Sequence, residues 1–318
     1  MKAIFWNPGE HRLRAGWRLL LFGVLLLLTA IPAAFVREAD SGTLYTRLAA
    51  SQVLWMGLLF AATAFLARFV DHRPFSDFGL MRGPSWGLNL LFGVVLGAAM
   101  MGLVFGVELA AGWIRIKPAS ARWASEFHAA DLLYQVVLFL AVAVGEELTS
   151  RGYLLKNLAE GLNRGTGPSA AATLGAGLFG ALMFGLMHVG NESASFLTSL
   201  NIATGGVFLG LGFLWTRSLA IPMGAHFSWN FFQGPIFGFP VSGENVGQTV
   251  LDIAQGGPVV VTGGAFGPEG GLLSTVATAL GIGAMALWVR WRAGSVCLRE
   301  EISLPPSSFK TASEPQDS

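Results

Sequence analysis

Charged residues are scarce in this sequence, and their scarcity indicates its class. Only 12% of the 318 residues are charged and 53% are apolar, whereas about a quarter of the residues in a soluble domain are charged. The formal net charge is +1, and the basic residues lie between apolar runs and form no continuous stripe, so nucleic acid is not an expected partner. The composition therefore predicts a polytopic membrane protein.

Cysteine is almost absent as well. The single Cys297 excludes an internal disulfide and any cysteine-based metal cluster. Because neither a second cysteine nor a histidine lies nearby in the sequence, we interpret Cys297 as an unreactive thiol near a helix end. A His-Glu-x-x-His zinc helix is also missing, and no internal repeat suggests a repeat-built transporter.

The sequence is rich in apolar runs of about 20 residues, the length that crosses a bilayer as a helix. They predict an all-α polytopic transmembrane bundle of about eight helices. We divide the chain into a cytoplasmic segment 1–16, a transmembrane domain 17–298 and a disordered cytoplasmic tail 299–318. The runs lie at residues 17–36, 48–70, 87–113, 131–156, 172–192, 196–216, 219–238 and 271–291.

The distribution of lysine and arginine predicts the orientation. Alternate connections place fifteen of these residues on the side of both termini and five on the other side, which favours cytoplasmic termini. The first run follows a basic segment, so a cleavable signal peptide is the alternative to an uncleaved anchor. The connection from 239 to 270 has no lysine or arginine and reads as a flexible non-cytoplasmic loop.

One stretch places three charges inside an apolar segment: Gly145 to Gly152, which contains Glu146, Glu147 and Arg151. Ionisable groups at membrane depth are expensive and are candidates for function. On a helix, Glu147 and Arg151 are four residues apart and can pair on one face. Glu146 is then the free carboxylate and a candidate general base; the alternative is a carboxylate facing cytoplasmic water beside a helix-end ion pair.

Later apolar runs contribute three further polar residues. His188 can orient a water, accept a proton or ligate a metal, although a lone histidine is more often hydrogen-bonded between helices. His226 and Asn230 are four residues apart and share one helical face, where they could donate to a developing oxyanion or simply join helices. We expect these residues to converge with Glu146 near the cytoplasmic face. His188 would lie near mid-membrane if the fifth helix began near Leu174 and not at Pro168.

Together these residues supply a base, a water-orienting group and two oxyanion donors, an inventory that suits amide hydrolysis. Two other classes of function stay open. In a proton-coupled transporter or channel the Glu and His residues would relay protons. In a catalytically silent scaffold or immunity protein they would only hold the bundle together.

The pattern resembles the CAAX protease and bacteriocin-processing (CPBP) family of intramembrane endopeptidases, related to the type II CAAX prenyl endopeptidases. The resemblance covers about residues 130–235 and implies a multi-pass membrane metalloendopeptidase-like hydrolase, with this segment as its catalytic core and the active site inside the bundle. It rests on three motifs in the family's order, which are Glu146-Glu147-x-x-x-Arg151, Phe184-x-x-x-His188 and His226-x-x-x-Asn230.

The resemblance implies roles for these residues. Glu146 and His188 would activate the attacking water, and His226 and Asn230 would stabilise the oxyanion. Glu147 and Arg151 would be structural or orienting. The cofactor stays open: Glu146, His188 and His226 could hold a divalent metal such as zinc, or a glutamate-activated water could act without metal.

The resemblance also implies partners for the protein, and the use of basic residues bears on its compartment. A peptide or protein substrate at the membrane and the lipid bilayer itself are the expected partners, and the oligomeric state stays open. The family implies prenylated tails as one substrate class. However, the use of sixteen arginines and four lysines hints at a bacterial inner membrane, where prenylated substrates are unexpected.

Overall fold

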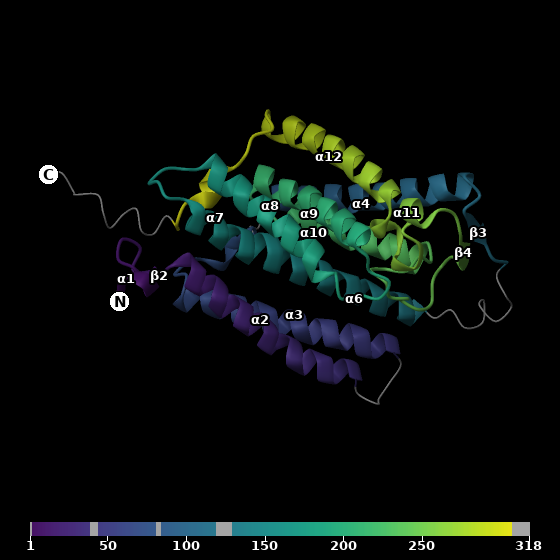
Figure 1. Ribbon diagram of the computed structural model, residues 1–318, viewed down its shortest axis with the longest axis horizontal. Helices are drawn as coiled ribbons and strands as arrows, with labels where there is room; N and C mark the ends of the chain where they lie inside the picture. The colour runs from purple at the N-terminus through teal and green to yellow at the C-terminus, as the bar shows by residue number, and fades with distance from the viewer. Residues whose placement is uncertain (1, 39–43, 81–83, 119–128, 307–318) are drawn as a thin grey trace.

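The fold is known from a computed structural model that describes residues 2–38, 44–80, 84–118 and 129–306. It is an all-α bundle whose helices run along the long axis of the molecule (Figure 1). Within the described residues, seven helical segments are long and apolar enough to cross a membrane. They are α2 (Ala15–Glu38), α3 (Leu44–Phe69), α4 (Pro84–Ala110), the continuous segment of α6 (Ala129–Glu147), η2 (Leu148–Leu155) and α7 (Lys156–Leu162), then α8 (Ala170–Met187), α9 (Phe196–Thr216) and α12 (Leu272–Ala293).

The eighth predicted span is not an ordinary membrane helix. In place of a helix over 219–238, the chain forms α10 (Ala220–Phe231) and a short π-helix, η3 (Phe232–Ile236). Twelve α-helical residues rise about 18 Å, well short of the ~30 Å hydrocarbon core of a bilayer. Residues 220–226 are all buried, and α10 packs against α4, α6 and α9. This helix is apolar because protein surrounds it, so its composition imitates that of a lipid-facing span.

The surface of the bundle is apolar along its sides. Leu27, Phe35, Phe65 and Leu287 are among many large apolar side chains that are more than half exposed. In water such a surface would be a strong aggregation liability. The chain is thus a multi-pass membrane protein, whose exposed apolar side chains face lipid.

Glycine lets α10 approach α4 very closely. A Cβ atom on Gly97 would collide with the carbonyl oxygen of Ala225, and one on Gly224 would collide with that of Leu90. Only residues without a side chain permit this contact between backbones. The contact fixes the position of α10 and hence of His226, which is next to Ala225.

We therefore expect Gly97→Ala to destabilise the protein by about 1–3 kcal/mol, the usual range for overpacking. Gly102→Ala is the matched control, because it lies on the same helix and its new Cβ would meet nothing within 4 Å. The control should be neutral or more stable by up to about 1 kcal/mol. Thermal unfolding of both variants in one detergent checks this; equal midpoints would contradict the close-packing account.

Short elements lie at the two ends of the bundle (Figure 1). One end holds α1 (Lys2–Phe5), β1 (Trp6–Asn7), its antiparallel partner β2 (Arg12–Leu13), η1 (Phe75–Phe78) and η6 (Glu300–Ser303). The other end holds β3 (Ile114–Ile116), its antiparallel partner β4 (Ile253–Gln255), α11 (Val259–Thr262), η4 (Gly264–Phe266) and η5 (Pro268–Gly270). We call the first the network end and the second the loop end.

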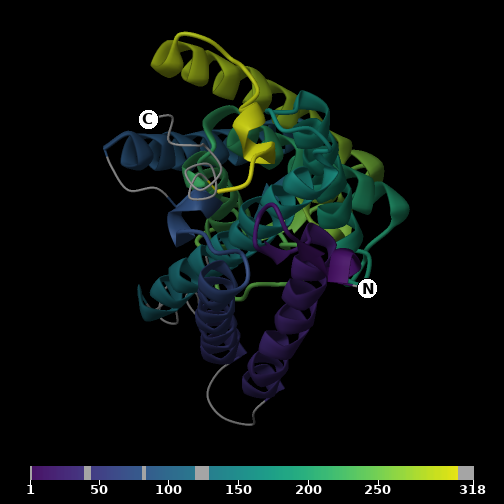
Figure 2. The ribbon, with the colours of Figure 1, turned by 90° about the vertical axis from the view of Figure 1, so that its left-hand side faces the viewer.

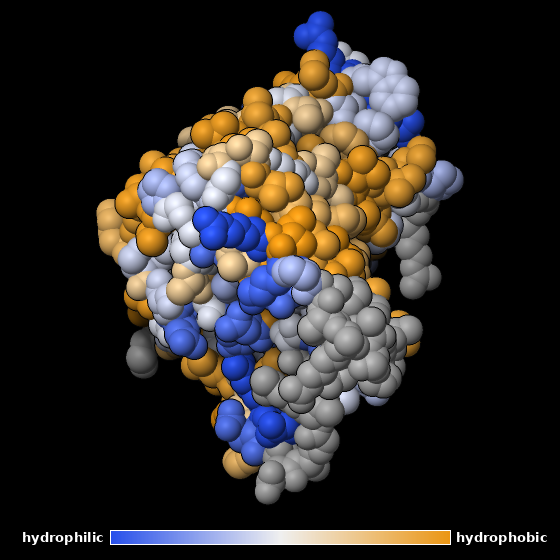
Figure 3. Space-filling model, turned by 90° about the vertical axis from the view of Figure 1, so that its right-hand side faces the viewer, coloured by the Kyte–Doolittle hydropathy of each residue, from blue (hydrophilic) through white to orange (hydrophobic). Residues whose placement is uncertain are grey.

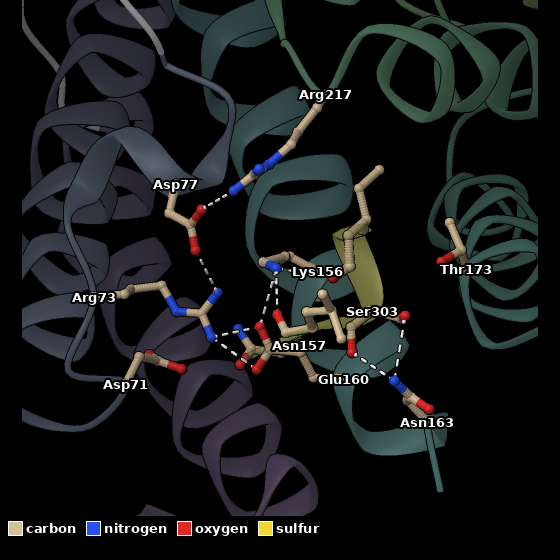
Figure 4. A network of polar contacts seen from close by, with 12 residues as sticks. Asp71, Arg73, Asp77, Lys156, Asn157, Glu160, Asn163, Thr173, Arg217 and Ser303 are labelled. Carbon is tan, nitrogen blue, oxygen red and sulfur yellow. Dashed lines mark hydrogen bonds and ion pairs between the residues drawn. The ribbon is translucent and has the colours of Figure 1, made fainter. Parts of the chain in front are cut away.

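A buried ionic network gives the network end its name (Figure 4). Glu160 of α7 forms ion pairs with Arg12, Arg18, Arg73 and Lys156 at distances of 2.6–3.3 Å. The side chain of Glu160 is 3% exposed. Because its partners come from the first segment, α2 and the turn after α3, this one carboxylate holds four parts of the chain together.

The prediction of a disordered tail after Arg299 is wrong for the first residues of this segment, which are ordered. Ile302 is fully buried, and the ammonium group of Lys156 donates hydrogen bonds to the carbonyl oxygens of Ile302 and Leu304, both at 2.9 Å. The apolar Ile302 and the buried lysine donor explain the order of residues 300–306. Residues 307–318 of the predicted tail lie outside the described residues.

Figure 2 shows the α2–α3 pair standing apart from the remaining helices on one side. α2 packs along α3, and α3 packs along α6. The elements from α6 to α10 form the central part of the bundle, and they carry every residue that the sequence motifs singled out.

Candidate active site

The two glutamates lie where a helix changes its winding. α6 ends at Glu147, and the next eight residues form the π-helix η2. Such segments are rare and occur frequently at functional sites. Glu147 is fully buried, whereas the side chain of Glu146 is 25% exposed. Neighbours in sequence thus have opposite environments: one carboxylate is enclosed in the protein and the other borders open space.

The Glu147–Arg151 pair predicted from the four-residue spacing is present. Nη1 of Arg151 donates to Oε1 of Glu147 at 2.8 Å. The guanidinium group also donates to the carbonyl oxygen of Gly206 on α9 at 3.1 Å, and its Cζ atom lies 4.4 Å from the ring centre of Phe184 on α8. Arg151 therefore neutralises Glu147 and fixes the position of three helices around it.

Glu147 has a second partner that the sequence did not predict. Nδ1 of His226 lies 2.9 Å from Oε1 of Glu147. A carboxylate only accepts hydrogen bonds, so we assign the Nδ1 proton to His226. Nε2 of the same ring then faces Glu146, 3.8 Å from Oε2. No local signal in the sequence shows which face of α10 meets α6, so this contact required the structure.

His188 directly follows α8 as the residue that caps its C-terminal end. The helix begins at Ala170 and not near Leu174, because the side-chain oxygen of Ser169 caps it by accepting the backbone N–H of Ala172. Nδ1 of His188 is 2.7 Å from the carbonyl oxygen of Phe184. Since a carbonyl only accepts, Nδ1 is the donor and Nε2 is left free.

Phe184 brings the two histidines into one cluster. Its ring centre is 5.0 Å from that of His188 and 6.0 Å from that of His226, with the latter pair edge to face. The phenylalanine of the Phe-x-x-x-His motif therefore has a physical role. It separates the two imidazoles and also covers the guanidinium group of Arg151.

Glu146, His188, His226 and Asn230 all line one cavity of about 330 Å³. This volume is at the lower end of the ~300–1,000 Å³ typical of ligand sites. The polar residues converge on a space with largely apolar walls, which are formed by residues such as Phe139, Phe184, Met100, Phe208 and Leu209.

The metal set suggested by the resemblance is not assembled in this arrangement. Among the residues that the structure describes, no three His, Cys, Asp or Glu side chains stand close enough together to hold a metal ion. This includes Glu146, His188 and His226. A site of the His–His–carboxylate type needs its donors about 2 Å from one point, so no step of the chemistry below depends on a metal.

The cavity also has a roof that the sequence did not predict. The connection from 239 to 270, expected to be a flexible loop, contains β4, α11, η4 and η5, and its residues Val241, Ser242 and Glu269 line the cavity. Oε1 of Glu269 accepts the backbone N–H of Ser242 at 2.5 Å, and Oε2 accepts from the amide of Gln233. This buried carboxyl group holds the loop on η3.

Burial raises the pKa of Glu269 to about 7, although hydrogen bonds from Ser242 and Gln233 act in the opposite direction. The folded protein therefore binds this proton more tightly than the unfolded chain does. The corresponding stability is complete below about pH 4.5 and is lost as the pH rises through about 7, and it amounts to about 3 kcal/mol.

The measurement is the thermal unfolding midpoint between pH 4.5 and 8, for the wild type and for Glu269→Gln, whose neutral amide mimics the protonated acid. The difference between the two proteins should change with pH over this window. Parallel pH profiles would show that Glu269 does not titrate as described.

Comparison with known proteins gives one match. Residues 128–232 match the model of a family described as Type II CAAX prenyl endopeptidase Rce1-like. No match was found among curated proteins or among solved structures. The matched third of the chain runs from α6 to the end of α10 and contains every motif residue. The resemblance predicted from the three motifs is therefore confirmed for this segment.

Proposed function

We propose that this protein is an intramembrane endopeptidase that hydrolyses a peptide bond with a water molecule activated by Glu146. One observation carries the proposal: Glu146, His188, His226 and Asn230, which come from three separate helices, all line a single cavity. Hydrolysis needs a base, an oxyanion site and room for a peptide, and this cavity offers all three. The match of the same segment to a protease family favours hydrolysis over a proton relay.

In the proposed reaction, the carboxylate of Glu146 takes a proton from water while the water oxygen attacks the carbonyl carbon of the peptide. Nε2 of His188 is free to orient this water, because Nδ1 is engaged with the carbonyl oxygen of Phe184. The tetrahedral intermediate then collapses. The C–N bond breaks, and Glu146 returns its proton to the departing amine.

The oxyanion would be stabilised by His226 and Asn230. With Nδ1–H held by Glu147, a protonated His226 presents Nε2–H to the cavity, and the amide of Asn230 lies one helical turn further on the same face. Glu147 and Arg151 are positioning residues in this scheme. They fix the imidazole ring and supply the negative charge that favours its protonated form.

A serine nucleophile is a less suitable alternative. The sequence contains a Gly-x-Ser-x-Gly string at residues 83–87, yet Ser85 lies in the first turn of α4 and does not line the cavity. The strained turn between a strand and a helix that exposes such a serine in hydrolases is not what α4 provides. Direct attack by water therefore fits the site better.

Asn230→Ala is expected to lower turnover by about 10²–10³, the usual effect of removing one oxyanion donor. The assay is cleavage of a synthetic peptide mixture by purified full-length protein, followed by mass spectrometry. Asn191→Ala is the matched control: it lines the same cavity, but its amide is already donated to the carbonyl oxygen of Ser242. Equal losses in both variants would refute the role of Asn230.

A further inference from the structure

The position of the cavity along the bundle determines the side from which it can be reached. Many of its lining residues come from the last turn of α2, the first turns of α3 and α12, the first half of α9 and the ends of α8 and α10, together with the loop residues 241–246. These segments adjoin the loop end, and the remaining lining residues, on α4 and α6, lie near the middle of the bundle. The cavity therefore opens at the loop end beside its roof, between the loop residues Glu244 and Asn245 and the ends of α2 and α8, where Arg37 and Asn191 complete the rim.

Figure 3 looks onto the loop end, where hydrophilic residues form a band from the middle of the face downward and hydrophobic residues cover much of the part above it. An exposed ion pair between Arg37 and Glu244, at 2.7 Å, joins the end of α2 to the loop at this rim. A polar rim above apolar walls admits a polypeptide from water and then offers apolar contacts to its side chains.

The opposite direction is closed by protein. Between Glu146 and the network end, the chain continues through Leu148, Arg151, Tyr153 and Leu155, all of which are buried. Tyr153 donates to Asp71 at 2.8 Å, and beyond it lies the ionic network around Glu160. A second, smaller pocket near the network end is lined by residues such as Ser85, Asn89 and Trp215 and by none of the motif residues.

The charge distribution places these ends with respect to the membrane. The structure moves Arg151 from a connection into the bundle interior. Of the other lysines and arginines in the described residues, twelve lie in segments at the network end and four in segments at the loop end, and lysine and arginine favour the cytoplasmic side. The loop end is then non-cytoplasmic.

From these observations we infer that the catalytic cavity is reached from the non-cytoplasmic side, and that its substrate is an extended, largely apolar stretch of polypeptide presented there. The part of the inference that concerns the substrate rests on the proposed peptidase function. It departs from the expectation of hydrolysis near the cytoplasmic face. A prenylated tail produced in the cytoplasm would meet the closed network end.

Cysteine labelling tests this inference directly, because the chain has one native cysteine. Cys297 is exposed and follows α12 at the network end. The two probes are Asn245→Cys at the rim and Val142→Cys in the cavity, one turn before Glu146, each combined with Cys297→Ser. Whole cells that express the full chain are treated with a small membrane-impermeant thiol reagent before and after permeabilisation.

Both probes should react in intact cells to the same extent as after permeabilisation, whereas native Cys297 should react only after permeabilisation. Reaction of Cys297 in intact cells, or of Asn245→Cys only after permeabilisation, would overturn the orientation. A Val142→Cys probe that reacts in denatured protein but not from outside intact cells would overturn the access route. Glu192→Cys, in the exposed turn after α8, replaces Asn245→Cys if that variant does not fold.

This labelling does not depend on turnover, so it separates the two proposals. If the cavity is labelled from outside while Glu146→Gln cleaves peptides at the wild-type rate, the peptidase function fails and the access route stands. If the cavity is labelled only from the cytoplasm while Glu146→Gln is inactive, the peptidase function stands and the access route fails.

Discussion

Glu146→Gln is expected to reduce kcat/KM for peptide cleavage by about 10²–10⁴, the contribution usual for a general base. Glutamine keeps the size of the side chain and its contact with water but cannot accept the proton. The cavity, the Glu147–His226 contact and the ion pair with Arg151 should persist, because none of them uses Glu146 as a hydrogen-bond partner. The effect should therefore appear in activity and not in stability.

The measurement is a steady-state cleavage assay with purified full-length protein, together with the thermal unfolding midpoint of each variant. Glu192→Gln is a matched control, because this carboxylate is exposed at the loop end and does not line the cavity. It should cleave as the wild type does. A Glu146→Gln variant with the activity of the control would remove the base from the proposed reaction.

The largest loss of stability is expected for Glu160→Gln at the network end. The substitution leaves Arg12, Arg18, Arg73 and Lys156 around a neutral amide, although Asp71 and Asp77 still pair with Arg18 and Arg73. Breaking a buried ion pair by removing one partner typically costs about 3–5 kcal/mol. We expect a loss of at least this size, because Glu160 has four partners.

The matched control is Glu244→Gln, which removes the carboxylate from an exposed pair. Arg37 and Glu244 are 44% and 50% exposed, and exposed pairs contribute about 0–1 kcal/mol. Thermal unfolding of both variants in one detergent compares them. Similar small losses would mean that Glu160 does not organise the network end, and would weaken the argument that this end is closed.

The apolar runs predicted most of the fold. One run was wrongly predicted to be a membrane span, and it shows the limit of a prediction from composition. Seven of the runs became long helices, while residues 219–238 became α10 and η3. A helix surrounded by protein and a helix surrounded by lipid both lack charge. Composition alone cannot separate them, and the glycine contacts of α10 with α4 become visible only in three dimensions.

The motif spacing predicted the contacts within one helix but not those between helices. The four-residue interval correctly paired Glu147 with Arg151. The contact between Glu147 and His226 joins residues 79 positions apart, and its geometry depends on the rotation of α10 against α6. This contact gives Glu147 a more specific role than the orienting one that the resemblance implied.

The ionic network and the roof of the cavity had no sequence signal. The members of the network are single charges in separate segments, and Arg12 and Glu160 are 148 positions apart. Glu269 lies among glycines in a connection that reads as a loop. In both cases a buried carboxylate gathers partners from distant segments, which no local periodicity reveals.

The central claim is that water held by Glu146 attacks the peptide bond directly inside this cavity. Cleavage of a synthetic peptide mixture by the purified protein in ¹⁸O-labelled water, with hydroxylamine present, tests it most directly. The account predicts products whose new carboxyl termini carry solvent oxygen, with no hydroxamate, and a rate of product formation for Glu146→Gln that is at least about 10² lower. Hydroxamate at the new termini would reveal an acyl-enzyme, and cleavage by Glu146→Gln at the wild-type rate would place the chemistry elsewhere; either result would contradict the account.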